Sequence, residues 1–321
     1  MKHLCLFIII IVSVSAQVSV TDTSFAKNRI GIDSSEISYF YENNEITLQP
    51  EKLDSISLME KPDVFRRQFN YPVIITLGAV TATSLYFIND YYQNTWWRDK
   101  AEFKFMNDWK YALWIDKLGH FYGTYLQSFA FSSGFEASGF HTEESAWYGA
   151  SCALALQLYI EVQDGYGPQW GFSPGDAVSD LLGSSYFVLK YYYPYLNNFQ
   201  PRVSYYPSKE YLNRTNNDHN IMDDYEGQKL WLSIRIKNLL PESVAEYWPS
   251  FLMLSIGYAV KNHQPDGYKE NEFYIAFDID AEEIPLFGKG WQFVKNTLNY
   301  LHFPLPGLRI SPGLKFVPIS Y

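Results

Sequence analysis

The hydrophobic pattern of the chain changes its period near Pro201, and this change most restricts the possible folds. Before Pro201, apolar and small residues recur at helical spacing in four segments: residues 71–88, 110–134, 144–164 and 173–193. After Pro201, apolar and polar residues alternate in "KLWLSIRI", "FLMLSIGYAV", "NEFYIAFDID" and "LRISPGLKFVPISY". We therefore predict an α+β protein that is mainly α with a β-rich C-terminal region. Its compact bundle of about four helices is followed by a small antiparallel sheet.

The N-terminal part of the chain differs in character from the rest. Residues 1–16, "MKHLCLFIIIIVSVSA", combine a lysine, an apolar run and small residues at the end, which is typical of a signal peptide. Residues 17–66 are polar and weakly periodic, so we expect a poorly ordered lead-in. We then expect residues 67–200 to form the helical bundle and residues 201–321 to form the β-rich region.

Charge and aromatic content point to the cell envelope. The net charge is -10 and no dense basic tract occurs, so we predict no nucleic-acid partner. The uncharged run "PVIITLGAVTATSLYFI" is followed by "NDYYQNTWW", which is typical of an interfacial aromatic belt. The run fits either a membrane span or a buried hairpin helix. We expect an exported protein of the bacterial envelope, in the periplasm or at the outer membrane. A membrane is its expected partner, and the sequence leaves the identity of any protein partner open.

Three consecutive helical segments each carry a narrow polar stripe. The stripes consist of Asp116, His120, Thr124 and Gln127, then Gln157, Glu161 and Asp164, then Asp176, Asp180 and Ser184. They can be the solvated faces of an amphipathic bundle, or they can face one another inside it. We favour the internal arrangement, because the residues of the stripes have short side chains and the small residues beside them permit close helix packing. His120 should then lie within hydrogen-bond reach of a carboxylate from another helix.

A metal site is one hypothesis for this polar network, although the sequence itself names no cofactor. One imidazole with several carboxylates suits Zn, Mn or Fe(II). The candidate ligands are His120, Glu161, Asp164, Asp176 and Asp180.

Acid/base chemistry is the other hypothesis for the same network. Asp116 or Glu161 would orient the His120 imidazole, and Lys117 would hold an anionic group. Together with the candidate metal ligands, these residues form the full set of candidate catalytic residues. No nucleotide-binding glycine motif and no Gly-x-Ser-x-Gly elbow occurs, so the sequence predicts no cofactor-binding residues.

The motifs that carry these residues resemble those of a known family. They are Asp116-Lys117-x-x-His120, Glu161-x-x-Asp164, and Gly171-Phe172-Ser173-x-x-Asp176 with Asp180 and Gly183. In type and order they resemble the domain of unknown function 2279 family of predicted periplasmic lipoproteins, over roughly residues 70–200. They are more distantly similar to VanZ-like membrane proteins. The resemblance implies a helical fold and an envelope location, but it implies no reaction.

We therefore expect a membrane-associated envelope protein whose helical bundle has an internal polar network and a structural or binding role. The alternative is a metal-assisted or acid/base hydrolase that acts on an envelope lipid or glycan.

Overall fold

The computed structural model describes residues 40–42, 45–47, 69–213, 221–261 and 270–321. The predicted signal peptide, and nearly all of the predicted lead-in, lie outside the described residues. Within the lead-in, β1 (Phe40–Glu42) and β2 (Glu45–Thr47) pair as antiparallel strands.

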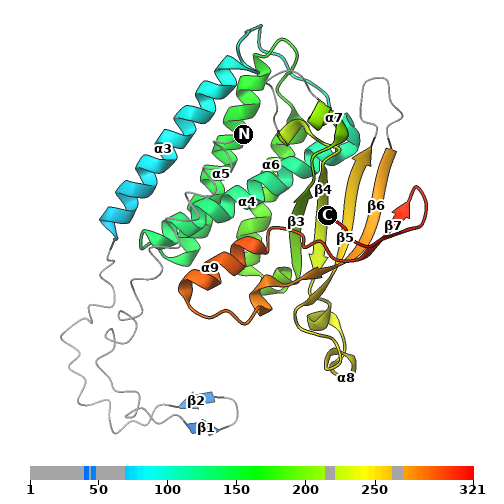
Figure 1. Cartoon of the computed structure of the whole chain (residues 1–321). Helices are drawn as coiled ribbons and strands as arrows, with labels where there is room; N and C mark the ends of the chain where they lie inside the picture. The colour runs from blue at the N-terminus through cyan, green and yellow to red at the C-terminus, as the bar shows by residue number, and fades with distance from the viewer. Residues whose placement is uncertain (1–39, 43–44, 48–68, 214–220, 262–269) are drawn as a thin grey trace, which may run out of the picture.

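Four long helices form the first half of the fold, as the sequence predicted. They are α3 (Tyr71–Asn94), α4 (Ile115–Ala137), α5 (Thr142–Gly165) and α6 (Pro174–Tyr192). Helix α4 packs against both α5 and α6, whereas α3 lies along the side of the bundle with few contacts (Figure 1). The bundle core is therefore α4, α5 and α6, and α3 is a peripheral helix.

The sequence placed one helix start correctly and one too early. Ser173 is the N-cap of α6, where its side chain accepts a hydrogen bond from the backbone amide of Asp176, and Pro174 is the first helical residue. The helix predicted from residue 110 begins only at Ile115. The reason is that Ala112, Leu113 and Trp114 have left-handed φ angles of 48°, 55° and 74°. A short 3-10 turn (Tyr111–Trp114) therefore precedes α4.

The second half of the chain forms one antiparallel sheet of six strands in sequence order. The strands are β3 (Phe199–Tyr205), β4 (Gln228–Ile234), β5 (Leu252–Lys261), β6 (Glu270–Ile279), β7 (Gly307–Ser311) and β8 (Lys315–Val317). Short helices lie between them: α7 (Lys209–Asn213), α8 (Glu242–Ala245) and α9 (Lys289–Leu298). The sequence indicated only about four strands. It missed β3, an edge strand that tolerates Pro201, and it did not separate β7 from β8.

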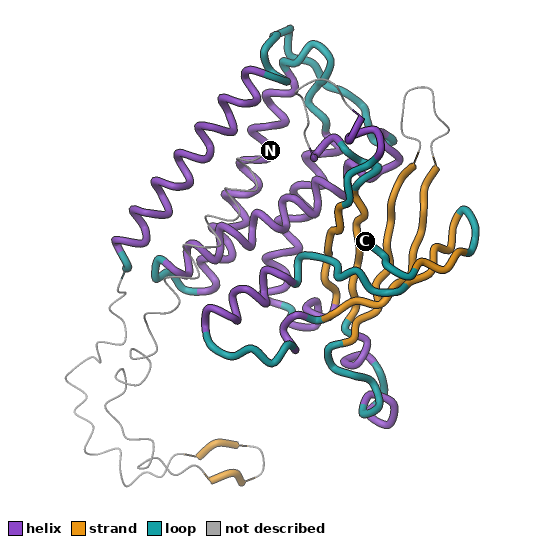
Figure 2. The backbone as a smooth tube through the Cα atoms, viewed as in Figure 1, coloured by secondary structure: helices purple, strands orange, loops and turns teal. Residues whose placement is uncertain are grey.

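Buried aromatic residues join the helices to the sheet. Tyr122 and Tyr125 of α4 pack with Leu230 and Val260 of the sheet and with Tyr300, which follows α9. The Tyr122 hydroxyl also donates to the backbone carbonyl of Tyr300 at 2.6 Å. In the backbone view the bundle and the sheet lie side by side (Figure 2). The two halves therefore share one hydrophobic core.

Candidate functional site: an acidic centre around Lys117 and His120

The polar stripes of α4, α5 and α6 face one another inside the bundle. The side chains of Asp116, Glu161, Asp176 and Asp180 are 10%, 3%, 7% and 0% exposed. Such low exposure excludes the arrangement in which the stripes are solvated faces. The predicted internal network is therefore confirmed, and its members must satisfy one another's charges.

Lys117 lies at one end of this network and contacts three carboxylates. Its Nζ atom is 2.8 Å from Asp108 Oδ2, 2.8 Å from Asp116 Oδ2 and 2.7 Å from Asp176 Oδ1. Burial disfavours its charge, but Asp116, Asp108 and Asp176 outweigh burial and raise the Lys117 pKa. Lys117 is therefore a fixed ammonium ion that holds a turn before α4, α4 itself and α6 together.

His120 lies one turn further along α4 and contacts carboxylates through both ring nitrogens. Its Nδ1 is 3.2 Å from Asp180 Oδ1, which confirms the predicted contact with a carboxylate of another helix. Its Nε2 is 3.9 Å from Glu161 Oε1 and 3.7 Å from Asp176 Oδ1. Asp180 also accepts from the Thr124 hydroxyl at 2.7 Å. The shorter Nδ1 contact makes Asp180 the residue that orients the ring.

The start of α6 ties the remaining acidic groups into the centre. The hydroxyl of Ser173 donates to Asp108 Oδ1 at 2.5 Å, and the backbone amide of Ser173 donates to Glu161 Oε2 at 3.2 Å. Beside them, the Tyr225 hydroxyl donates to Asp116 Oδ1 at 2.6 Å. Residues from α5, α6 and the segment before β4 thus meet around the N-terminal half of α4.

Burial and charge shift the pKa values of this centre in opposite directions. Burial raises the pKa of Glu161 to about 8 and that of Asp176 to about 6, although nearby His120 opposes both shifts. Burial lowers the pKa of His120, but hydrogen bonding and attraction to Asp180, with Asp176 and Asp116, outweigh it and raise the value to about 10. At neutral pH the centre therefore contains an imidazolium ion beside a protonated Glu161.

The centre has more acidic than basic groups. Asp108, Asp116, Glu161, Asp176 and Asp180 surround only two basic side chains, Lys117 and His120. Protonation of Glu161 reduces the excess of negative charge, which a low-dielectric interior disfavours. A bound cation would reduce it in the same way.

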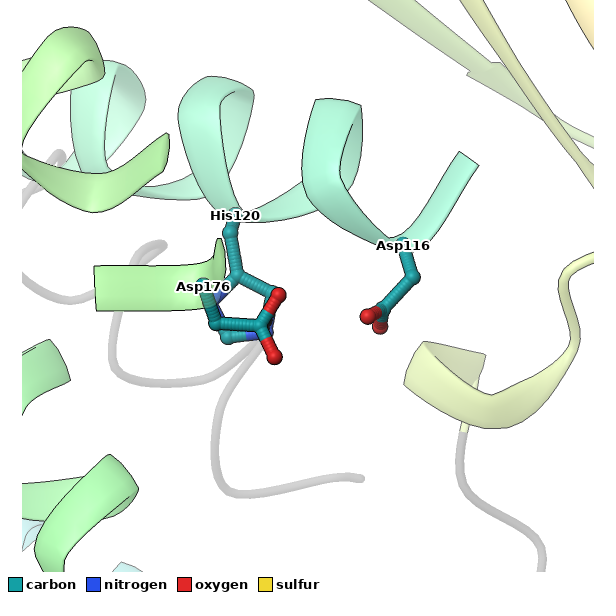
Figure 3. Close-up of side chains that lie close together, drawn as sticks. All are labelled: Asp116, His120 and Asp176. Atoms are coloured by element: carbon teal, nitrogen blue, oxygen red, sulfur yellow. Dashed lines mark ion pairs between the residues drawn. The ribbon is translucent and has the colours of Figure 1, made fainter. Parts of the chain in front are cut away.

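Two overlapping groups of side chains have a geometry that suits a cation. The first is Asp116, His120 and Asp176, and the second is His120, Glu161 and Asp180. In each group one ligand atom per residue lies within 4.8 Å of the others. Figure 3 shows the His120 ring beside the Asp176 carboxylate, with Asp116 one turn along α4. In the first group Lys117 already pairs with both carboxylates, so a cation there would compete with its ammonium ion.

One predicted site residue lies outside the centre, and two residues of the centre were not predicted. Asp164 accepts a hydrogen bond from the Trp97 indole at 2.6 Å, and burial raises its pKa to about 6. Asp108 and Tyr225 were missed because both lie outside the long helices, where periodicity gives no signal. Only the tertiary contacts with Lys117 and Asp116 reveal them.

A second polar cluster lies under the sheet and contains the residue types of a catalytic triad. Asp278 Oδ2 is 2.9 Å from His302 Nδ1, and His302 Nε2 is 3.2 Å from Ser320 Oγ. The Ser320 hydroxyl donates to the backbone carbonyl of Leu305, so its proton does not point at His302. All three side chains are buried, and Arg202 Nη1 lies 3.0 Å from Asp278. This cluster is therefore a structural network.

Fold and site together define an α+β protein with a buried acidic centre in a three-helix core. The family model of domain of unknown function 2279, described as a predicted periplasmic lipoprotein, matches residues 104–192. This range is narrower than the predicted resemblance, but it contains every residue of the centre except Tyr225. The family's description agrees with the predicted export to the bacterial cell envelope. Neither the curated proteins nor the solved structures give a match. The VanZ-like resemblance stays a prediction.

Proposed function

We propose that the chain is an exported bacterial envelope protein that associates with a membrane through its apolar outer surface. Its acidic centre then has a structural or binding role inside the bundle. One observation carries the proposal: both halves of the fold expose many large apolar side chains, while many polar and charged side chains are buried. Soluble proteins normally have the reverse distribution.

The sheet has this distribution on its two faces. The exposed side chains of one face are Leu232, Ile256, Phe273, Ile275, Phe277, Leu308, Ile310 and Phe316, which are 38–61% exposed. On the other face, Ser233, Ser255, Glu272 and Asp278 are buried beside Trp231, Met253, Ala259 and Tyr274. Charged side chains therefore lie on the covered face, whereas eight large apolar side chains lie on the exposed part of the opposite face. Strands that contact lipid have apolar residues outside and polar residues inside, which supports a lipid-facing surface.

Helix α3 supports the same proposal. It has 24 residues, and its most apolar window of 18 residues has a mean hydropathy of 1.6 with only 11% of the window buried. A helix of this length extends about 36 Å, which exceeds the roughly 30 Å of a hydrocarbon core. A buried hairpin helix would be covered by the bundle, so the exposure of α3 favours the membrane alternative.

Carbonate extraction of membranes from cells that produce the chain tests this proposal. The chain should stay with the membrane pellet, because apolar contacts resist alkaline wash. A double variant, Ile275→Lys with Phe277→Lys, should release a larger fraction, since a charge on a lipid-facing strand costs about 2–4 kcal/mol near the midplane. Glu246→Lys, at an exposed residue after α8, is the matched control and should behave like wild type. Full release of the wild-type chain contradicts the proposal.

A hydrolase is the second candidate function, and the pairing of Glu161 with His120 favours it. A carboxylic acid with a pKa of about 8 beside an imidazolium ion can give a proton to a leaving group near neutral pH. We propose an envelope lipid or glycan as the substrate of this branch. A cation held by His120, Glu161 and Asp180 would make the reaction metal-assisted.

Two measurements test the hydrolase branch. Elemental analysis of protein purified without added metal should give a stoichiometric transition metal if the metal-assisted form is correct, and its absence removes that form. Incubation with envelope lipid and glycan fractions, followed by mass spectrometry, should give cleaved products with wild type and at least 100-fold less with Glu161→Gln. Equal product from both proteins would contradict a role for Glu161 as an acid.

A further inference from the structure

A cavity of about 350 Å³ lies at the opposite end of the bundle from the acidic centre. It is lined by Phe129 and Ser132 of α4, by Phe187 and Lys190 of α6, and by Gln200 and Tyr300. His120 and Ser132 are twelve residues apart on α4, which is about 18 Å along the helix. The cavity is therefore separate from the acidic centre, and its volume suits a small organic molecule.

Lys190 has polar partners at this cavity but no carboxylate among its described ion-pair contacts. Its Nζ atom donates to the Tyr125 hydroxyl at 2.8 Å and to Gln200 Oε1 at 2.8 Å. Tyr125 in turn donates to Gln200 Oε1 at 3.2 Å. A neutral amine has two N–H groups and one lone pair. The two acceptors therefore satisfy a neutral Lys190 and leave its lone pair for a ligand.

The charges around the cavity favour this neutral amine. Burial, together with the charges of Arg235 and Arg202, lowers the pKa of Lys190 to about 7, and Glu282 opposes this shift. Glu282 is neutralised in part by Arg235, which lies 2.6 Å from it.

Four other titratable groups line the same cavity, namely Glu282, Glu136, Tyr191 and Tyr300. Burial raises the pKa of Glu136, which favours its uncharged form. Lys117 has the opposite environment, because three carboxylates contact its ammonium ion.

We propose that Lys190 is a nucleophilic amine that forms a Schiff base with a small aldehyde or ketone bound in this cavity. The Nζ lone pair attacks the carbonyl carbon and forms a C–N bond. The carbonyl oxygen takes up the two protons that the amine nitrogen releases and leaves as water, so that an imine remains and no oxidant or reductant is needed. The Tyr125 hydroxyl, which accepts from Nζ at 2.8 Å, is positioned to relay a proton from the amine in this step. Phe129, Phe187 and Tyr300 provide an apolar lining for the ligand.

Reductive trapping of the full-length protein in detergent tests the proposal. The probe is propanal with sodium cyanoborohydride, and peptide mass spectrometry reads the modified lysines. At pH 7, Lys190 should be alkylated at least 100-fold faster than the exposed Lys100, because a far larger fraction of it is neutral. Between pH 7 and 9 the rate of Lys190 labelling should rise only about two-fold, because about half of this amine is already neutral at pH 7. Equal labelling of the two lysines at pH 7, or a Lys190 rate that rises about 100-fold, overturns the proposal.

The concentration dependence separates a binding cavity from a merely reactive amine. The rate of Lys190 labelling should saturate with propanal, whereas that of Lys100 should rise linearly. Linear kinetics at both lysines overturn the binding site. Lys190→Met should lose the label at this position and keep the thermal melting curve of wild type within a few degrees, because methionine introduces no charge. Tyr125→Phe should slow labelling of Lys190 several-fold, since it removes the proton relay but keeps the ring, and an unchanged rate overturns the role of Tyr125.

Discussion

At the scale of single residues, Lys117 is the group on which the acidic centre depends. It is 4% exposed and contacts carboxylates from α4, from α6 and from the segment before α4. A buried ion of this kind contributes little net stability when its partners are present, because desolvation offsets the attraction. Removal of the Lys117 ammonium ion, however, leaves three buried carboxylates without their shared cation. The centre is therefore sensitive to the loss of this one side chain.

Replacement of Lys117 by Met tests this dependence. We expect the free energy of unfolding to fall by about 3 kcal/mol, because uncompensated buried carboxylates remain. The measurement is chemical denaturation in detergent at pH 7. The control is Lys100→Met, which removes an exposed lysine and should change stability by no more than about 0.5 kcal/mol. Equal effects of the two substitutions would show that the centre does not need its cation.

The raised pKa values of Glu161 and His120 predict a pH dependence of stability. The folded state keeps the Glu161 proton up to about pH 8 and the His120 proton up to about pH 10, whereas the unfolded chain loses them near 4.5 and 6.5. Between about pH 5 and 7 the folded protein therefore binds more protons, and its free energy of unfolding falls as pH rises, whereas above pH 7 the lowered pKa of Lys190 acts in the opposite direction. Melting temperatures at pH 5 should exceed those at pH 7.

The variant Glu161→Gln separates the two groups in this experiment. The variant removes the titration of residue 161, so the decrease in the free energy of unfolding between pH 5 and 8 should become smaller. The decrease that His120 causes above pH 6.5 should remain. Glu246→Gln, at an exposed residue, should keep the wild-type slope. A melting temperature that rises from pH 5 to pH 7 would contradict the raised pKa values of Glu161 and His120.

At the scale of elements, close contact between α4 and α6 brings the polar stripes together. Gly183 of α6 is buried, and a Cβ atom there would overlap the backbone carbonyl of Phe121. Gly119 of α4 has open space at the same atom. Both glycines lie in helices, but only Gly183 is required for the close contact between α4 and α6.

The two glycines give a matched pair of substitutions. Gly183→Ala should lower the free energy of unfolding by about 3 kcal/mol, because α6 must move away from α4 and weaken the centre. Gly119→Ala should raise it by up to about 1 kcal/mol, because alanine favours the helix and meets no neighbour. Thermal melts of both variants measure the difference. If Gly183→Ala is as stable as wild type, the two helices are not in the close contact described here.

At the scale of the whole molecule, Tyr300 connects the sheet half with the bundle. Its ring stacks on Phe129 at 4.6 Å between centroids and lies 5.0 Å from the ring of Tyr125. Its backbone carbonyl accepts from Tyr122 and from the amide of Val203 in β3. The bundle and the sheet should therefore unfold together, although the sequence suggested separate regions that divide near residue 200.

Hydrogen exchange tests this cooperativity. In wild type, amides of α4 and β4 should lose protection in the same transition as denaturant rises. Tyr300→Ala should lower stability by about 3 kcal/mol in both elements together, because it empties part of the shared core. Tyr195→Ala, at a side chain that is 64% exposed, is the control and should have a small effect. Loss of protection in β4 alone would mean that the halves are independent units.

The sequence by itself determined the four long helices, the β-rich character of the C-terminal half and most of the candidate site, because these depend on local spacing. Residues four apart on one helix necessarily share a face, so Asp116 and His120, or Asp176 and Asp180, could be grouped without a structure. Capping chemistry is also local, which is why the start of α6 at Ser173 was predictable.

Only the tertiary structure decided which stripes meet and which outside residues join them. Lys117 is next to the stripe in sequence, and its three partners come from separate segments that long-range packing brings together. Asp108 and Tyr225 lie outside the long helices, so no periodic pattern marks them. The exposure of the largely apolar face of the sheet is tertiary as well. Alternation divides a strand into two faces, but packing alone decides which face is covered.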